Sequence, residues 1–596
     1  MPITPAPASS AEPAPWLLLL ASGTLARRLP FLRGASTCPA LLPVGIKSAA
    51  AHIVDFHADR VARVLVMVNP GEEDRVREEL AARGDQIVVR GVQTASVIHT
   101  LRAALDCLQN ELLPPGAPLP ECIVNLASTV PACFPAPAEV QIAEDPEPST
   151  RWSSIAPQNG GPALFVRKGA DAGLPDGAAA WPFTGVMRLP GAVLRAAADA
   201  AQGNDLIEVV AQAQQRQPLR YTHTPWIDVG HDIHYPEARA RLIASRSFNA
   251  IRVEPVLSVL HKSSRNVAKF QQEIAFIRML PEDIAPFFAR LLSPVQVKDG
   301  TASVAMEFYG YPTVAELALF WDLDASEWER FFAAMAQVLR RFRRHRYELG
   351  ARATRRFYGD KLRERVDAWF AALPPETLLR LRAPGLSLNS EPLPDFEALW
   401  PQLQPRIEAL YDPEHFCVMH GDFCFNNILY DPYSGAVRLI DARGSFGEDC
   451  VGIYGDQKYD LAKLAHSAIG RYDHFISNLF TLIDDGTAGY TLRFAERENQ
   501  AVLERLTLRL IGQLGYAPAD VMLLTGMLFL SMTPLHADDA RRQLAMYLHG
   551  LALTQRALTM PKKASADGVA ASTDIAQVAR EAHQLEISHG RNAHLY

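Results

Sequence analysis

The stretch that decides the fold is Val418–Gly444, which reads VMHGDFCFNNILYDPYSGAVRLIDARG. A short apolar run leads into a His-Gly-Asp tripeptide that ends at Asp422, and an asparagine stands five residues after that aspartate. A turn at Tyr430–Gly435 predicts a hairpin, and its second strand, Val437–Ile440, ends at Asp441. The segment therefore places two carboxylates and an amide at a loop and at a strand end.

This combination resembles the aminoglycoside phosphotransferase/choline kinase family, a branch of the protein-kinase-like fold. The resemblance covers roughly residues 248–555. It implies an α+β, two-lobed domain, with a small lobe at about 248–312 and a helical large lobe at about 313–558. It also implies Mg²⁺-dependent transfer of a phosphoryl group from ATP or GTP to a hydroxyl of a small molecule.

Each polar residue of the segment has a chemical role within this resemblance. A carboxylate in a rigid loop aims an acceptor hydroxyl and accepts its proton, so Asp422 is the expected catalytic base. Asn427 and Asp441 are the expected Mg²⁺ ligands, because their side chains offer the oxygens that this ion prefers. Asn426 is off this register and is the second choice. His420 is expected to be structural, bonded to the backbone of the loop.

The lysine that holds the nucleotide phosphates should lie upstream on a strand, with a helix glutamate as its partner. Lys262 ends the expected strand Leu257–His261, and Glu273 stands on the expected helix Val267–Leu280. Lys269, four residues before Glu273, competes as an ordinary surface partner. The hairpin that precedes the lysine contains no glycine, so no glycine-rich loop is available to cover the phosphates.

Two further segments continue the resemblance. Val304–Leu317 resembles the hinge after the small lobe, where backbone groups near Glu307 and Tyr309 would read the edge of the base; the alternative is a plain strand, turn and helix without a ligand. Gly455–Tyr472 resembles the family's GDxxYDLA segment. Its Asp460 is expected to cap a helix or to brace the catalytic loop, as is the aspartate four residues earlier.

Residues 16–235 indicate a separate α/β domain. Short apolar runs alternate with amphipathic stretches, which predicts strands at 16–21, 64–68, 86–89 and 121–126 and helices at 72–83 and 96–110. Residues 16–48 resemble the opening of the sugar-nucleotide nucleotidyltransferases, in which a strand leads into a glycine-rich loop and then Pro-Lys-x-Leu-Leu-Pro-Val-Gly. The resemblance implies a Rossmann-like fold.

The working residues of the nucleotidyltransferases are largely missing. The glycine-rich loop is reduced to Gly23, Arg28 or its neighbour is the cation left to serve a triphosphate, and Pro39 stands where the signature lysine belongs. Ser128 stands where a metal-binding aspartate belongs, although a second carboxylate remains at Asp228. We therefore expect a degenerate site that binds a ligand or only supports the second domain.

Composition limits the class of protein. A length of 596 residues exceeds what one hydrophobic core supports, so two or more domains are expected. The net charge of −7 argues against broad nucleic-acid binding. The seven cysteines show no CxxC spacing, which favours a reduced, cytoplasmic protein without structural zinc. We find no apolar run of ~18–20 residues that predicts a membrane span, and the ends, 1–15 and 559–596, are expected to be flexible tails.

Three functions follow from these patterns. The first is a kinase of a small hydroxylated molecule, such as a sugar, a choline-like compound or a precursor of capsule or lipopolysaccharide. The second is a bifunctional enzyme that also nucleotidylates the product, and the third is a catalytically silent nucleotide-binding scaffold. The complete set of Asp422, Asn427 and Asp441 favours the first. The acceptor-binding helices are expected at 327–369 and 400–411, but their sequence does not identify the acceptor. The sequence does not indicate the oligomeric state either.

Overall fold

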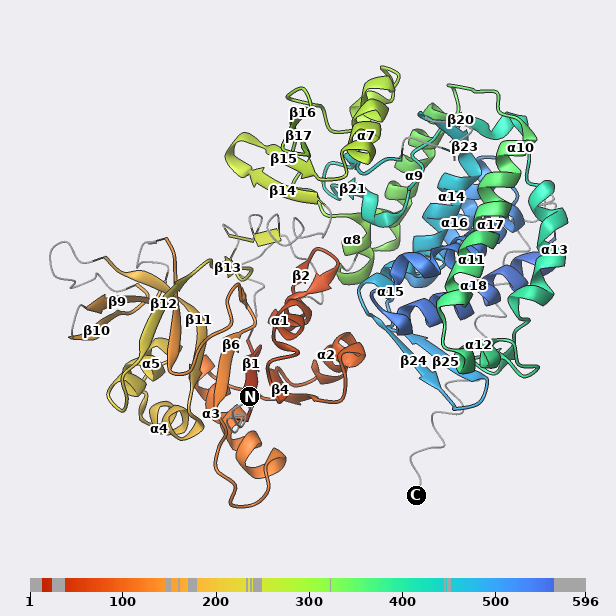
Figure 1. Cartoon of the computed structure of the whole chain (residues 1–596). Helices are drawn as coiled ribbons and strands as arrows, with labels where there is room; N and C mark the ends of the chain where they lie inside the picture. Colours follow the sequence, from red (N-terminus) through yellow and green to blue (C-terminus); the bar gives the residue numbers. More distant parts are fainter. Residues whose placement is uncertain are drawn as a thin grey trace, which may run out of the picture.

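The structure is a computed structural model that describes residues 13–23, 38–145, 152–158, 161–169, 179–231, 234–235, 238–239, 249–321, 323–443, 446 and 452–561. Its first part is built on a large mixed sheet, and its second on a small sheet followed by a body of helices (Figure 1). Arg28 and most of the two expected tails lie outside the described residues.

The large sheet has nine strands in the order β10-β9-β11-β6-β1-β4-β5, with β8 beside β11 and β12 beside β8. At its centre, β1 (Trp16–Leu20) lies between the parallel strands β4 (Arg63–Val68) and β6 (Cys122–Leu126), and every residue of β1 is buried. The other strands are β5 (Ile87–Gly91), β8 (Glu139–Ala143), β9 (Ser154–Gln158), β10 (Gly161–Val166), β11 (Trp181–Leu189) and β12 (Arg220–Thr224).

Helices cover both faces of this sheet, which makes it Rossmann-like. Side chains of β1 alternate between two cores: Leu18 and Leu20 pack on one, and Leu17 and Leu19 on the other. The first core is closed by α3 (Val97–Cys107), α4 (Gly191–Ala200) and α5 (Leu206–Gln214), and the second by α1 (Ala49–His57) and α2 (Glu73–Leu80). Short pairs at the edge join β2 (Pro43–Val44) to β3 (Lys47–Ser48) and β7 (Thr129–Val130) to β13 (Ile227–Asp228).

The small sheet is antiparallel, in the order β14-β15-β17-β16. Its strands are β14 (Asn249–Glu254), β15 (Val259–Ser264), β16 (Gln296–Lys298) and β17 (Thr301–Glu307). Helix α7 (Val267–Met279) packs Phe270 and Ile274 against this sheet. Lys262 therefore lies inside a strand that runs to residue 264, whereas the sequence analysis placed it at the strand's end.

The large lobe is mainly helical and shares one extensive core. Its helices are α8 (Val314–Phe320), α9 (Ala325–Phe342), α10 (Ala351–Thr354), α11 (Lys361–Ala372), α12 (Pro375–Leu381), α13 (Phe396–Glu408), α14 (Gln457–Ala468), α15 (Tyr472–Ile476), α16 (Gln500–Gln513), α17 (Pro518–Met532) and α18 (Ala540–Thr559). Its strand pairs are β20 (Phe416–Val418) with β23 (Tyr454–Asp456), and β21 (Ile428–Tyr430) with β22 (Val437–Leu439). A further sheet joins β18 (Ser387–Leu388), β19 (Glu391–Pro392), β24 (Phe480–Asp484) and β25 (Gly489–Phe494). Helix α14 lies in the interior, and all of its residues are buried.

One described segment, Pro518–His536, is long and apolar enough to cross a membrane, judged by length and composition alone. The sequence analysis expected no such segment, and that expectation was wrong. The segment is α17 with the turn that follows it, and most of it is buried inside the protein. It packs between α14 and α18 (Figure 1), which is the position of a core helix.

Buried polar contacts join the two halves of the chain. Arg239 lies between them in the sequence, and its guanidinium is 2.7 Å from the carboxylate of Glu316 on α8, which is fully buried. The same guanidinium donates to the C=O of Gly310 (3.3 Å). Arg497 donates to the C=O of Leu319 on α8 (2.6 Å) and lies 3.4 Å from the buried Glu79 of α2. Helix α8 is therefore bonded both to the connecting segment and to a residue that contacts the first half.

Candidate active site

Backbone hydrogen bonds gather the expected catalytic residues at the edge of the large lobe. In the β21–β22 hairpin the N–H of Ile440 donates to the C=O of Asn427 (3.0 Å), which brings Asp441 beside Asn427. The N–H of Arg443 donates to the C=O of His420 (2.9 Å). The loop before β21 and the segment after β22 are thus held side by side.

A buried carboxylate on α14 braces this loop. Both oxygens of Asp460 accept backbone N–H groups, from His420 (2.7 Å) and Gly421 (2.8 Å), and the residue is fully buried. Gly421 has φ +78°, and a Cβ there would lie 3.1 Å from a backbone oxygen of the segment after β22, so the turn requires glycine. Asp456, by contrast, caps α14 by accepting an N–H of its first turn.

Asp422 lies between two cations. Arg443 Nη2 is 3.4 Å from Asp422 Oδ2, and Lys463 Nζ is 3.0 Å from Oδ1. Although burial acts to raise it, the Lys463 ammonium and the Arg443 guanidinium hold the pKa of Asp422 far below its ordinary value. The sequence analysis did not single out Lys463. The sequence feature that could have indicated Lys463 is its position three residues after Asp460, which puts both side chains on one face of α14.

Asn427 and Asp441 offer the oxygens that a Mg²⁺ ion prefers. The amide N–H of Asn427 donates to the C=O of Asp422 (2.9 Å), and its Oδ1 accepts from no described residue. The Asp441 side chain is 41% exposed. One amide oxygen and one carboxylate suit a Mg²⁺ ion whose other ligands would be phosphate oxygens and water. Among the described residues there is no group of three His, Cys, Asp or Glu side chains that could hold a metal ion. Asn426, the second choice, donates instead to the buried Asp473 (3.0 Å).

Lys262 connects the small sheet to this site. Its Nζ lies 2.6 Å from Glu273 Oε1 and 2.7 Å from Asp441 Oδ1. Burial acts to lower the pKa of Lys262, but the two carboxylates outweigh it and raise the pKa above the ordinary value. The competing partner, Lys269, forms no ion pair with any described residue.

The expected hinge is partly occupied by contacts within the protein. The N–H of Glu307 donates to the C=O of Arg290 (3.0 Å), and the N–H of Phe308 to the C=O of Ser258 (2.8 Å). The Glu307 carboxylate also binds the Arg290 side chain and the Tyr309 hydroxyl. Of the hinge residues Glu307, Phe308 and Tyr309, only Tyr309 has a backbone N–H that no described residue accepts.

His420 is fully buried, and its ring stacks on Phe288 with the centroids 5.9 Å apart. Its Nδ1 accepts the backbone N–H of Asp422 (3.2 Å). Burial lowers the pKa of His420 to about 4, so the imidazole is neutral at pH 7. The ring therefore positions the loop, and as a neutral imidazole it is not a general acid at neutral pH.

In the first half, the two expected metal positions meet, but the remaining carboxylate is already bound. An added Cβ at Gly230 would lie 2.6 Å from the side chain of Ser128. Asp228 is buried; its Oδ1 accepts the N–H of Gly230 (3.1 Å), and its Oδ2 is 2.9 Å from His231 Nδ1. Both backbone groups of Gly23 are bonded to the side-chain amide of an asparagine after β4.

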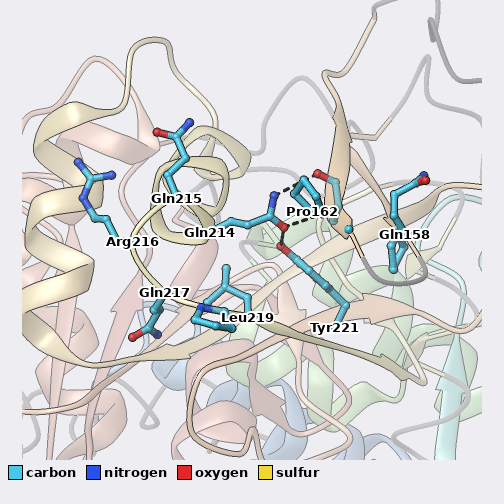
Figure 2. A pocket seen from close by; sticks show the side chains of 12 residues that line it. Gln158, Pro162, Gln214, Gln215, Arg216, Gln217, Leu219 and Tyr221 are labelled. Carbon is cyan, nitrogen blue, oxygen red and sulfur yellow. Dashed lines mark hydrogen bonds between the residues drawn. The ribbon is translucent and has the colours of Figure 1, made fainter.

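A cavity of about 480 Å³ opens elsewhere in the first half, between α5, β12 and the β9–β10 hairpin (Figure 2). Gln214 spans it, and its Oε1 accepts the hydroxyl of Tyr221 (2.6 Å) and the N–H of Ala163 (3.0 Å). Among the described residues that line it there is no carboxylate, histidine or cysteine.

Residues 307–471 match the model of the phosphotransferase enzyme family, known as APH. The matched segment includes Asp422, Asn427, Asp441 and Asp460, and also Lys463. No curated protein matches the chain.

Solved structures of two kinds are similar to the two halves of the chain. A thermostable mutant of aminoglycoside phosphotransferase APH(4)-Ia is 13% identical, covers 51% of this chain and 88% of its own, and has a TM-score of 0.33. The phosphotransferase APH(3'')-Id from Streptomyces rimosus is 19% identical, covers 52% and 90%, and has a TM-score of 0.27. The UTP-bound UGPase from Acinetobacter baumannii is 11% identical, covers 39% and 95%, and has a TM-score of 0.29.

Proposed function

We propose that this chain, whose residues 307–471 match the phosphotransferase enzyme family, is a kinase that transfers the γ-phosphoryl group of ATP or GTP to a hydroxyl of a small molecule. The observation that carries the proposal is the contact of Lys262 with both Glu273 and Asp441, across the gap between the small sheet and the large lobe. Phosphoryl transfer needs a cation for the phosphates, oxygen ligands for a metal and a carboxylate at the acceptor, and all three lie together here.

The nucleotide phosphates take the place between Lys262 and the large lobe. Glu273 holds the ammonium in position, and Lys262 exchanges its contact with Asp441 for the phosphate oxygens. Asn427 and Asp441 would hold Mg²⁺, which would neutralise charge on the phosphates. The hinge contributes the N–H of Tyr309 to the base.

Asp422 aims the acceptor. Its carboxylate accepts a hydrogen bond from the acceptor hydroxyl, whose oxygen then bonds to the γ-phosphorus. The bond from that phosphorus to the bridging oxygen breaks, and the nucleoside diphosphate leaves with the electron pair. Because Lys463 and Arg443 keep Asp422 ionised, the carboxylate acts mainly by orientation, and the hydroxyl proton leaves through it as the new bond forms.

For the first half we propose a supporting or ligand-binding role without nucleotidyl transfer. The proposal is supported by Ser128 and by the two contacts that bind the oxygens of Asp228. A chemistry that requires Mg²⁺ needs carboxylates that are free to coordinate it. We expect no release of pyrophosphate from CTP, UTP or GTP in the presence of sugar phosphates.

The first test is thermal unfolding with ATP, GTP and CTP, each with and without Mg²⁺. A nucleotide at 100 times its Kd should stabilise the domain that binds it by roughly 2.7 kcal/mol. We expect a Mg²⁺-dependent shift in Tm that Asp441→Asn removes. Asp299→Asn is the matched control, because Asp299 also has a positive φ but lies in an exposed turn. A shift that survives Asp441→Asn would place the metal elsewhere, and no shift with any nucleotide would support a silent scaffold.

A further inference from the structure

The second half of the catalytic loop is anchored to α14 and α15. The backbone N–H of Phe425 donates to Ser467 Oγ on α14 (3.1 Å). The side-chain Nδ2 of Asn426 donates to Asp473 Oδ1 on α15 (3.0 Å). Asn427 is the next residue and ends the short 3₁₀ turn that the other two loop residues begin. The side chain that we place on Mg²⁺ therefore follows directly after two anchored residues.

The Asn426–Asp473 pair is buried, and its hydrogen bonding is incomplete. Asn426 is 7% exposed and Asp473 is 2% exposed. Asn426 Oδ1 and Asp473 Oδ2 are both buried, and no described residue donates a hydrogen bond to either oxygen. Asp473 also forms no ion pair with any described residue. Because a buried carboxylate without a cation is costly, the pair calls for one more proton donor.

A neutral group at position 473 supplies that donor. An ionised carboxylate only accepts hydrogen bonds, whereas a protonated carboxyl accepts with one oxygen and donates with the other. Such a group accepts from Asn426 Nδ2 and offers its O–H to Asn426 Oδ1, so one proton serves both remaining oxygens. Burial raises the pKa of Asp473 to about 7, although the nearby Ser467 hydroxyl acts to lower it. The other titratable groups that interact with Asp473 are the Tyr472 hydroxyl of its own helix and the Cys424 thiol of the loop.

This pair differs from the brace that Asp460 provides. Both oxygens of Asp460 accept backbone N–H groups, which suits an ionised carboxylate. Only one oxygen of Asp473 has a donor among the described residues. The two buried aspartates should therefore respond in opposite ways to replacement by asparagine, which has one acceptor oxygen and one NH₂ donor.

We propose that Asp473 is a positioning residue: as a neutral carboxyl it forms a doubly bonded pair with Asn426, and this pair fixes Asn427 for the binding of Mg²⁺. The action of Asp473 is indirect, through Asn426. The role toward Mg²⁺ rests on the proposed function, but the bonding of the pair does not depend on phosphoryl transfer.

The first test is the thermal unfolding of the full-length Asp473→Asn variant. Its NH₂ group donates to Asn426 Oδ1 and the buried charge is removed, so we expect a Tm above that of the wild type at pH 8, by about 2 °C or more. Because the pKa of Asp473 is higher in the folded than in the unfolded chain, the wild type loses stability as the pH rises through about 7. Asparagine does not titrate, so the advantage of the variant should grow between pH 5 and pH 8.

Asp460→Asn is the matched control, because it should lower the Tm at both pH values. An Asp473→Asn variant that is destabilised like Asp460→Asn would mean that both oxygens of Asp473 accept N–H groups. That result would overturn the neutral pair.

The second test separates positioning from stability. Asn426→Leu/Asp473→Leu removes both partners at once, and it should recover most of the Tm that Asn426→Leu alone loses, because no polar atom is left buried without a partner. The Mg²⁺ concentration that gives half of the ATP-dependent shift in Tm should nevertheless rise about 10-fold in the double variant, the usual effect of losing a group that orients a metal ligand. Asp473→Asn should keep the wild-type Mg²⁺ affinity.

Leu399→Ala on α13 is the control for this test, because it removes buried methyl groups and lowers the Tm but should leave the Mg²⁺ affinity unchanged. A double leucine variant with wild-type Mg²⁺ affinity would show that the pair only stabilises the fold, which would overturn the positioning role. If the wild type shows no Mg²⁺-dependent shift with any nucleotide, the proposed kinase fails and the role toward Mg²⁺ fails with it. The Tm of Asp473→Asn still decides the bonding of the pair in that case.

Discussion

At the scale of the residue, the chemistry of Asp422 is set by two neighbours from different segments. Lys463 comes from α14 and Arg443 from the segment after β22, and both lie within 3.4 Å of the carboxylate. A carboxylate whose pKa is held this low is a weak base. Its value to the reaction is that it is always ionised and always points the same way.

Replacing Asp422 therefore has two measurable effects. Asp422→Asn should lower the rate of transfer about 10²- to 10⁴-fold, the usual contribution of a positioned base, while ATP binding stays nearly unchanged. It should also destabilise the fold by about 1–3 kcal/mol, because the buried Lys463 loses its partner. The double variant Asp422→Asn/Lys463→Met should recover most of the stability and none of the activity. Unfolding in urea and an ATP-consumption assay measure the two effects, and a normal rate in Asp422→Asn would refute its role.

Lys361 supplies a pH-dependent prediction. Burial and the nearby cations lower its pKa to about 7; the groups that act on it are Arg365 of its own helix, Arg443, Lys463 of α14 and Asp422 of the catalytic loop. An ordinary lysine has a pKa near 10.4, so Lys361 should hold roughly a thousandfold more neutral amine at pH 7. Its acylation rate should rise through about pH 7 and level off above it. A rate that still climbs at pH 9 would show that the amine is not shifted.

At the scale of the element, α14 and the residue that caps it supply three of the groups that shape the site. Asp456 caps the helix, Asp460 braces the catalytic loop and Lys463 contacts Asp422. The spacing of four and three residues puts them on one face of the helix. From the family segment the sequence predicted a cap or a brace for each of the two aspartates, and the structure gives the cap to Asp456 and the brace to Asp460. The sequence did not indicate Lys463, because a lysine in a helix is usually an exposed residue.

The brace can be tested against the cap on the same helix. Asp460→Asn replaces one acceptor by an NH₂ group that faces a backbone N–H, so we expect a loss of about 1.5–3 kcal/mol in the free energy of unfolding. The catalytic loop should also shift, and a displacement of this kind can lower kcat by up to about 10²-fold. Asp456→Asn is the control, since asparagine caps helices well and should leave kcat unchanged. Equal values of kcat in the two variants would mean that Asp460 only stabilises the fold.

At the scale of the whole molecule, the first half meets the kinase-like half beside its hinge. Arg239 is bonded to the C=O of Gly310, in the stretch that follows the hinge residues, and paired with the buried Glu316 of α8. The hydroxyl of Tyr235 donates to the C=O of Pro43, at β2, and holds the connecting segment to the first half. The connecting segment is therefore bonded both to the first half and to the stretch that follows the hinge.

Removing the Arg239–Glu316 ion pair should lower the stability of the protein. Arg239→Met leaves Glu316 buried without a partner, and we expect a loss of about 3–5 kcal/mol in the free energy of unfolding. The double variant Arg239→Met/Glu316→Leu should recover most of it, because it removes the uncompensated charge. Unfolding in urea followed by tryptophan fluorescence measures the change. A loss below about 1 kcal/mol would show that the pair is open to water and does not hold the junction.

The sequence by itself determined the elements and the chemical types of the site. The apolar runs predicted the central strands of the first sheet. Strands β1 and β4 are covered on both faces, so nearly all of their residues are apolar. The spacing within residues 418–444 predicted the hairpin that brings Asp441 to Asn427, because a hairpin is fixed by local turn geometry.

Only the tertiary structure decided which charges meet. Lys262 and Asp441 are 179 residues apart in the sequence and 2.7 Å apart in space. The pKa of Lys361 is likewise lowered by its burial and by cations that include Arg443 and Lys463, from other segments. The physical reason is that periodicity and turn preferences act over a few residues, whereas the electrostatic environment of a side chain is set by every segment that folds against it.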